Sequence, residues 1–209
     1  MTPIDLTLGH TPDLIDLCRD KGLTEAQTAY VLATAYHETA HTMRPVRETL
    51  ANTAHAAVAR LERAWTSGRL SWVSRPYWRP DAEGKSWHGR GYVQITWRRN
   101  YERLGARLGR DFTTDPEVVM RPDIAAEILV VGMAEGLFTG LSLVDFTAAD
   151  GSVDFYGARR VVNGTDRAHE IARIARAYRA ALAPDPAPSG LGGLLARLVA
   201  MFKRGKTDG

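Results

Sequence analysis

The chain has 209 residues, of which 44% are hydrophobic and 24% charged, a composition typical of one globular domain with a small appendage. Its single cysteine, Cys18, excludes an internal disulfide, and no apolar run reaches the ~20 residues that cross a bilayer. The net charge of +3 arises within residues 190–209, so the rest of the chain is neutral, which argues against general nucleic-acid binding. The acidic N-terminal segment lacks the basic region of a secretory signal.

Helical patterns cover most of the first 182 residues. A cap and proline at Thr11-Pro12 open the first helix, which we expect to end before Gly22. The capping box Thr24-x-x-Gln27 opens a longer one. The expected helices after the first are residues 24–43, 54–65, 122–138, 152–162 and 166–182. Residues 91–96 alternate between polar and apolar side chains, which predicts a strand.

A domain boundary is expected near residue 183. Three prolines fall within residues 183–190, which we interpret as a linker between a domain at 1–182 and a tail at 191–209. The tail has leucines and a phenylalanine at spacings of three and four, followed by lysines and an arginine. That pattern is typical of a helix lying on an anionic membrane surface through residues 191–206, and equally of a final helix that docks on the domain.

The segment "YHETAH" contains H-E-x-x-H, the signature of a zinc protease, in which His37 and His41 lie one helical turn apart and Glu38 is the base. Glu62 is the only convenient third ligand. No strand-rich half precedes Tyr30, as a zinc protease usually requires, and the zinc hypothesis leaves the later motifs unexplained. We therefore expect no metal.

Glu38 has a second interpretation as the acid of a carboxylate pair that cleaves sugars. Its helical neighbours Val31, Thr34 and Ala35 form a mainly apolar stripe. A carboxyl that is partly desolvated there would hold its proton more tightly, as a general acid must. His37 is then a core histidine that orients Glu38.

The matching base should lie on another element. Glu48 is the nearest candidate, and the flanking Arg44 and Arg47 would keep it ionised. An inverting mechanism requires ~6.5–9.5 Å between the two carboxyls. Taken alone, Glu48 is better explained as an ordinary surface residue in an arginine-rich loop, and Glu62 or Glu83 are the alternative bases.

The aromatic residues near the predicted strand also allow two interpretations. Trp87, Tyr92 and Trp97 are either core side chains or a platform for sugar rings, which stack on aromatic faces.

Four blocks, "YHETA", "VRET", "WHGRGYVQITWRRNY" and "RRVVNGTD", occur in this order between about Leu23 and Leu182. Together they resemble the glycoside hydrolase family 19 chitinases, and more closely the phage and prophage endolysins that share their helical fold. The resemblance implies a mainly α, lysozyme-like fold with a small β element lining the cleft.

The resemblance also implies roles for individual residues. Glu38 matches the general acid, Glu48 the general base, and Thr96 the hydroxyl that helps to hold the attacking water. The residues it assigns to substrate binding are His37, Tyr92, Gln94, Asn100, Tyr101 and Asn163. No cofactor is implied.

The expected function is an endolysin that hydrolyses β-1,4 bonds of peptidoglycan. We expect a monomer in the host cytoplasm that reaches the wall after the membrane is permeabilised. A chitinase of the same fold is the nearest alternative, although the cysteines and longer loops of the plant-type enzymes are missing here. The same residues are compatible with a lytic transglycosylase.

Two noncatalytic alternatives belong to other classes. One is a wall-binding domain. The other is a nucleic-acid-binding module, suggested by six arginines: Arg90, Arg98, Arg99, Arg103, Arg107 and Arg110. A solvated helix face also explains them, and the zero net charge of residues 1–189 favours that explanation.

Overall fold

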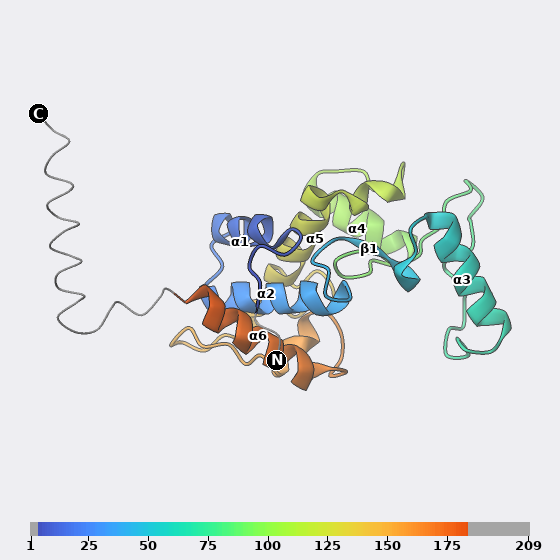
Figure 1. The fold of residues 1–209 in the computed structure, drawn as a ribbon. Coiled ribbons are helices and arrows are strands. Elements are labelled where there is room, and N and C mark those ends of the chain that lie inside the picture. Colours follow the sequence, from blue (N-terminus) through green and yellow to red (C-terminus); the bar gives the residue numbers. More distant parts are fainter. Residues whose placement is uncertain (1–3, 184–209) are drawn as a thin grey trace, which may run out of the picture.

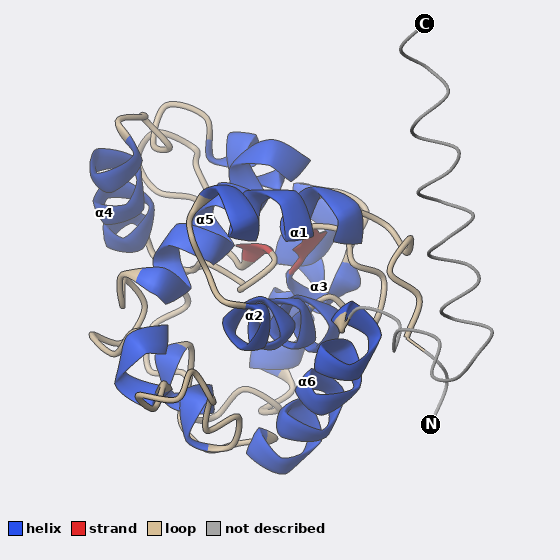
Figure 2. Ribbon diagram, turned by 90° about the vertical axis from the view of Figure 1, so that its left-hand side faces the viewer, coloured by secondary structure: helices blue, strands red, loops and turns tan. Residues whose placement is uncertain are grey.

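Helix α2, Glu25–Glu38, lies in the middle of the molecule, and Figure 2 shows it nearly end-on with other helices around it. The computed structural model describes residues 4–183, so the predicted tail and all but the first residue of the linker lie outside the described part. The other long helices are α1 (Thr11–Asp20), α3 (Ala54–Thr66), α4 (Arg98–Leu108), α5 (Pro122–Ala134) and α6 (Ala168–Leu182). Short 3-10 helices occupy Glu48–Leu50, Pro116–Met120, Leu143–Phe146 and Gly157–Val161.

The sequence of α2 suits a central position. Its residues from Ala29 to Ala35 are all buried, and small side chains on several sides let neighbouring helices approach. The buried hydroxyl of Thr34 donates to the Tyr30 carbonyl at 3.0 Å, so its polarity is satisfied inside the helix. The predicted capping box is confirmed, because Thr24 and Gln27 exchange both hydrogen bonds.

Two hydrophobic clusters lie on either side of the small β element. The larger one joins α2 to α1, α5 and α6, and α2 packs most extensively on α6. The smaller one contains Trp87, Tyr101 and Phe112 and lies between α4, α5 and the loop before α4. Helix α3 and the loop after it project from this body at the side of β1 (Figure 1).

The β element is smaller than the sequence predicted. Strands β1 (Val46–Arg47) and β2 (Arg90–Gly91) pair antiparallel, with Val46 opposite Gly91. The predicted strand at 91–96 is wrong, because the chain turns after Gly91 and Gln94 has a φ of 52°. Within this turn Tyr92 packs in the larger cluster and Ile95 in the smaller one.

Most helix predictions are confirmed, although the observed helices end at other residues than predicted. The helix predicted at 24–43 ends at Glu38, and the one at 122–138 ends at Ala134, where Gly136 follows with a φ of 71°. The helix predicted at 152–162 is wrong apart from the 3-10 turn at its end. There the side chain of Asp154 accepts from the backbone N–H of Gly157 and starts only a short turn.

The fold is therefore mainly α with a two-stranded sheet, consistent with the lysozyme-like helical fold expected from the sequence. None of the helices within residues 4–183 has both the length and the apolarity needed to cross a membrane.

Candidate active site

Glu38 is the last residue of α2, and its side chain is 19% exposed. Its Oε1 accepts a hydrogen bond from the Arg159 guanidinium at 2.7 Å, and Arg159 is 4% exposed. Arg159 also donates to the backbone carbonyl of Asp166 at 3.0 Å, which fixes the guanidinium in place. The predicted apolar surroundings of Glu38 are thus wrong in one respect, because a buried cation lies against one of its oxygens and leaves Oε2 for a reaction partner.

The neighbouring histidines do not have the arrangement of a zinc site. Because α2 ends at Glu38, His41 lies beyond the helix with a φ of 68° and stacks on Tyr36 at 4.4 Å between ring centroids. His37 faces Glu170 instead, with 4.0 Å between Nδ1 and Oε1. No group of three side chains of the metal-ligating type occurs within residues 4–183. The helical geometry that H-E-x-x-H requires is therefore absent from this segment.

Glu48 follows β1 and is held at both carboxylate oxygens. The Tyr77 hydroxyl donates to Oε1 at 2.7 Å, and the backbone N–H of Gly89 donates to Oε2 at 2.7 Å. Its own backbone N–H donates to the Gly89 carbonyl at 2.7 Å. Burial and the Glu48 charge raise the pKa of Tyr77, so the phenol remains a donor near neutral pH.

The expected role of the flanking arginines is wrong. Arg47 turns away from Glu48 and pairs with Glu117 at 2.5 Å, and Arg44 is exposed. Glu117 also pairs with the buried Arg90 at 2.6 Å. The ion pairs of Glu117 with Arg47 and Arg90 therefore hold the two strands next to Glu48, and they do not involve the Glu48 carboxylate.

The loop that carries Gly89 is fixed by buried polar contacts. Ser86 donates to the Trp78 carbonyl at 2.6 Å, so its oxygen accepts from Nδ1 of His88 at 3.0 Å. The His88 carbonyl accepts from Arg90 and from the Tyr101 hydroxyl, at 3.2 and 3.0 Å. Burial, reinforced by the nearby Arg90, lowers the pKa of His88 to about 4, so the imidazole is neutral at pH 7.

Gly89 is required by close packing. A Cβ at this position would come within 2.7 Å of Oε1 of Gln94 and 3.3 Å of Cβ of Glu48. The missing side chain lets the backbone N–H reach the Glu48 carboxylate. This residue was not singled out by sequence reasoning.

Gln94, Thr96 and Asn100 line one pocket of about 150 Å³ together with Val162. The Gln94 amide donates to the Val46 carbonyl at 3.0 Å and so ties the turn to β1. The Asn100 amide donates to the Thr96 carbonyl at 2.7 Å. Val93 and Ile95 line the same pocket, so residues of both parities in the predicted strand reach it from the turn.

Contacts connect this pocket to both carboxylates. Gln94 lies against Gly89, which binds Glu48. Val162 also lines the pocket, and the backbone N–H groups of Val162 and Asn163 donate to the carbonyl of Arg159, which binds Glu38. Asn163 itself is exposed. The predicted acid and base are therefore each linked, through one intermediate residue, to a residue that lines this pocket.

Two predicted substrate-binding residues are buried and do not line the pocket. Tyr92 is 1% exposed and packs in the larger cluster with its hydroxyl directed to the Met43 carbonyl. Tyr101 is fully buried and holds the His88 carbonyl. Of the proposed platform, Trp87 is 5% exposed and belongs to the core, whereas Trp97 lies against Tyr77 at 5.1 Å.

The alternative bases have structural partners. Glu62 accepts from the Trp78 indole at 2.9 Å and pairs with Arg79 at 2.6 Å. Glu83 pairs with Lys85 and Arg98 at 2.8 and 3.0 Å. Both carboxylates belong to ion pairs around the projecting loop, so Glu48 is the better candidate.

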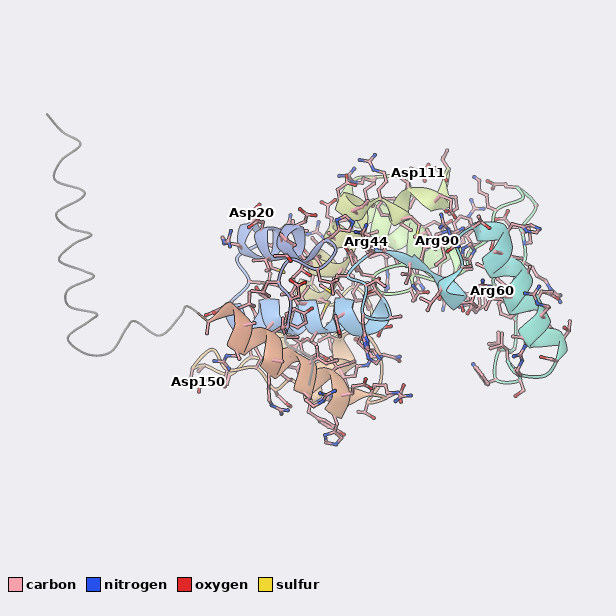
Figure 3. All side chains as sticks on the ribbon, viewed as in Figure 1. Asp20, Arg44, Arg60, Arg90, Asp111 and Asp150 are labelled. Carbon is pink, nitrogen blue, oxygen red and sulfur yellow. The ribbon has the colours of Figure 1, made fainter. Side chains whose placement is uncertain are left out.

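The arginine run is not a free cationic face. Four of its six members pair with carboxylates, at Glu117, Glu102, Glu135 and Glu127. Figure 3 shows Arg90 beside the β element, and its side chain is buried there. Arg103 donates to the carbonyl of Leu137, which leaves Arg99 as the one member without a hydrogen bond or ion pair to residues 4–183.

A mainly helical fold with two differently anchored carboxylates is the kind of framework on which glycosidases place their acid and base. Comparison with known families gives the particular class: residues 19–131 match the family described as chitinase class I, which is glycoside hydrolase family 19. The chain belongs to this family. The matched region contains Glu38, Glu48, Thr96 and Asn100, whereas Arg159 and Asn163 lie beyond it.

Individual relatives match over short segments. An endochitinase of Arabidopsis thaliana is 47% identical over 47 residues, which is 22% of this chain and 17% of the relative. An endochitinase of Brassica napus is 38% identical over 47 residues, 22% of this chain and 15% of the relative. A chitinase of Oryza sativa is 50% identical over 40 residues, 19% of this chain and 14% of the relative. The matches thus span less than a fifth of each relative's length.

Proposed function

We propose that this glycosidase is an endolysin that hydrolyses β-1,4 bonds of bacterial peptidoglycan with inversion at the anomeric carbon. Glu38 gives a proton to the leaving oxygen from Oε2, because Oε1 is bound to Arg159. Glu48 takes a proton from a water on the opposite face of the sugar, and the Thr96 hydroxyl orients that water. Asn100 and Asn163 bind the glycan beside the pocket.

The observation that carries this proposal is the way in which Glu48 is held. A phenol and a backbone N–H each donate to one of its oxygens, and each oxygen keeps a lone pair for a water. Both contacts hold the carboxylate in one orientation, so its remaining lone pairs are presented to a water from fixed positions. Glu38 has one oxygen bound to Arg159 and keeps Oε2 free of partners within residues 4–183, so Oε2 is the atom from which a proton would pass to the leaving oxygen.

A chitinase of the same mechanism is the second candidate, and the matches to plant endochitinases favour it. Both substrates contain β-1,4-linked N-acetylhexosamines, so the same carboxylates serve either one. The peptidoglycan proposal draws on the resemblance of the four sequence blocks to endolysins. Substrate choice therefore depends on the surfaces around the carboxylates.

The test is digestion of purified peptidoglycan and of a chitin oligomer, with product analysis by mass spectrometry. Reducing ends from peptidoglycan, with the α-anomer formed first in NMR spectra, support an inverting endolysin. Anhydro-sugar ends would identify a transglycosylase, and cleavage of chitin alone would identify a chitinase. Activity that is lost in EDTA and restored by zinc would return the zinc hypothesis.

A further inference from the structure

A second pocket, of about 540 Å³, lies next to the proposed base. Its lining combines three aromatic side chains, Tyr77, Trp97 and the largely buried Trp87, with four arginines. Tyr77 connects the proposed base with this pocket, because its hydroxyl donates to Glu48 while its ring lines the pocket. A glycan that passes Glu48 would therefore have this pocket beside one of its neighbouring units.

The aromatic part of the pocket is suited to sugars. The rings of Tyr77 and Trp97 lie 5.1 Å apart between centroids at an angle of 45°. The Arg99 guanidinium lies 5.9 Å from the centroid of Trp97. Pyranose faces stack on such rings, but aromatic surface alone does not distinguish a neutral glycan from a charged one.

The pocket contains both paired and unpaired arginines. Arg79 is paired with Glu62, and Arg98 is paired with Asp81, Glu83 and Glu102. Arg75 and Arg99 are both exposed, and neither forms an ion pair or hydrogen bond with residues 4–183. Two guanidinium groups are thus free to bind an anion at the edge of the aromatic surface.

We propose that Arg75 and Arg99, together with the rings of Tyr77 and Trp97, form a subsite for glycan units that bear carboxylates, such as the peptide stems of peptidoglycan. This inference rests on the proposed function and names what would distinguish its substrate from chitin. An N-acetylglucosamine polymer carries no charge, so it gains nothing from free guanidinium groups. A stem-bearing glycan presents carboxylates beside its sugar rings, and arginine binds carboxylates in a fork geometry.

The experiment measures binding with the full-length Glu38→Gln protein, which leaves the probes uncleaved. The probes are soluble peptidoglycan fragments with free stem carboxylates, the same fragments after carbodiimide coupling of those carboxylates to a neutral amine, and an N-acetylglucosamine oligomer. The test variant carries Arg75→Gln and Arg99→Gln. The matched control carries Arg176→Gln and Arg179→Gln, which remove the same charge from exposed positions on α6.

We expect the test variant to bind the charged fragments roughly tenfold more weakly, because each exposed charge contact contributes roughly a factor of three. Binding of the neutralised fragments and of the neutral oligomer should not change, and the control should match the parent protein. Added salt should weaken binding of the charged fragments to the parent more steeply than to the test variant.

Several outcomes would overturn the subsite. These are equal losses for all three probes, no loss for the charged fragments, or tighter Arg75- and Arg99-dependent binding of a single-stranded oligonucleotide than of the fragments. Failure of the proposed function is seen separately, when the wild-type enzyme leaves peptidoglycan intact. Whether or not the wild-type enzyme cleaves peptidoglycan, the difference in binding between charged and neutralised fragments shows whether Arg75 and Arg99 bind carboxylates.

Discussion

The two sides of the candidate active site are built differently. Glu38 ends a buried helix, and a single ion pair with Arg159 fixes its carboxylate. Glu48 follows a two-residue strand, and hydrogen bonds from Tyr77 and Gly89 fix its carboxylate. The loop that carries Gly89 is held in turn by the hydrogen bond between Ser86 and His88. The helical side owes its geometry to packing of the main core, whereas the loop side owes it to a network of polar contacts.

The largest expected effect comes from the helical side. Glu38→Gln should lower the rate of hydrolysis by roughly 10²–10⁴, because glutamine cannot give a proton. Glutamine can still accept from Arg159, so the melting temperature should fall little. Glu135→Gln is the control, since it removes a carboxylate that pairs with Arg107 near the C-terminal end of α4 and does not line the pocket of Thr96 and Asn100. A Glu38→Gln enzyme that keeps more than a few per cent of the activity would contradict the acid assignment.

On the loop side, only one carboxylate should matter for catalysis. Glu48→Gln should lower the rate by roughly a hundredfold or more, because the attacking water loses its base. Glu62→Gln and Glu83→Gln should stay within roughly twofold of the wild type, since exposed ion pairs contribute little. Rates measured on one substrate decide this, and a larger loss at Glu62 or Glu83 than at Glu48 would move the base to that residue.

Arg159→Met should affect stability as well as activity. It removes the buried partner of Glu38 and the donor to the Asp166 carbonyl, and breaking a buried pair costs about 3 kcal/mol. Urea titration measures the free energy of unfolding, and Arg160→Met is the neighbouring control with a more exposed side chain. Equal stability of the two variants would show that the Glu38–Arg159 pair does not hold the end of α2.

Tyr77→Phe tests one contact of the loop network. It removes the hydroxyl that donates to Glu48 and keeps the ring that contacts Trp97. We expect roughly tenfold lower kcat, because one hydrogen bond to a charged group contributes about 1.5 kcal/mol. A lower melting temperature with unchanged kcat would instead make Tyr77 a purely structural residue.

The smallest effect concerns the response of stability to acid. The pKa of His88 is about 4 in the folded state and about 6.5 when unfolded, so the unfolded chain binds the proton first. The stability contribution of neutral His88 is therefore present above about pH 6.5 and is lost as the pH falls toward 4, by at most about 3 kcal/mol.

Removal of the imidazole should reduce that acid response. His88→Asn keeps a donor for the Ser86 oxygen but cannot titrate. Between pH 7 and 4.5, the free energy of unfolding should fall more for the wild type than for His88→Asn. Parallel curves for the two proteins would show that His88 is not the source.

The sequence by itself determined the local features of this protein. The capping box at Thr24, the periodicity of α3 and α6 and the order of the four motif blocks depend only on residues close together in the chain. Such patterns are readable because helix formation and capping follow short-range rules. The region that matches the family, residues 19–131, contains the first three of these blocks.

Only the tertiary structure decided which partners surround the carboxylates. Arg159 reaches Glu38 across 121 positions of sequence, and Gly89 reaches Glu48 across 41. Arg47 is next to Glu48 in sequence yet pairs with Glu117, because the pairing of β1 with β2 turns it away. Tyr92 and Tyr101 share a motif with Gln94 and Asn100, but packing buries the tyrosines and leaves the two amides in the pocket. Contacts between distant segments follow from how helices and loops fill space, and no single stretch of sequence contains that information.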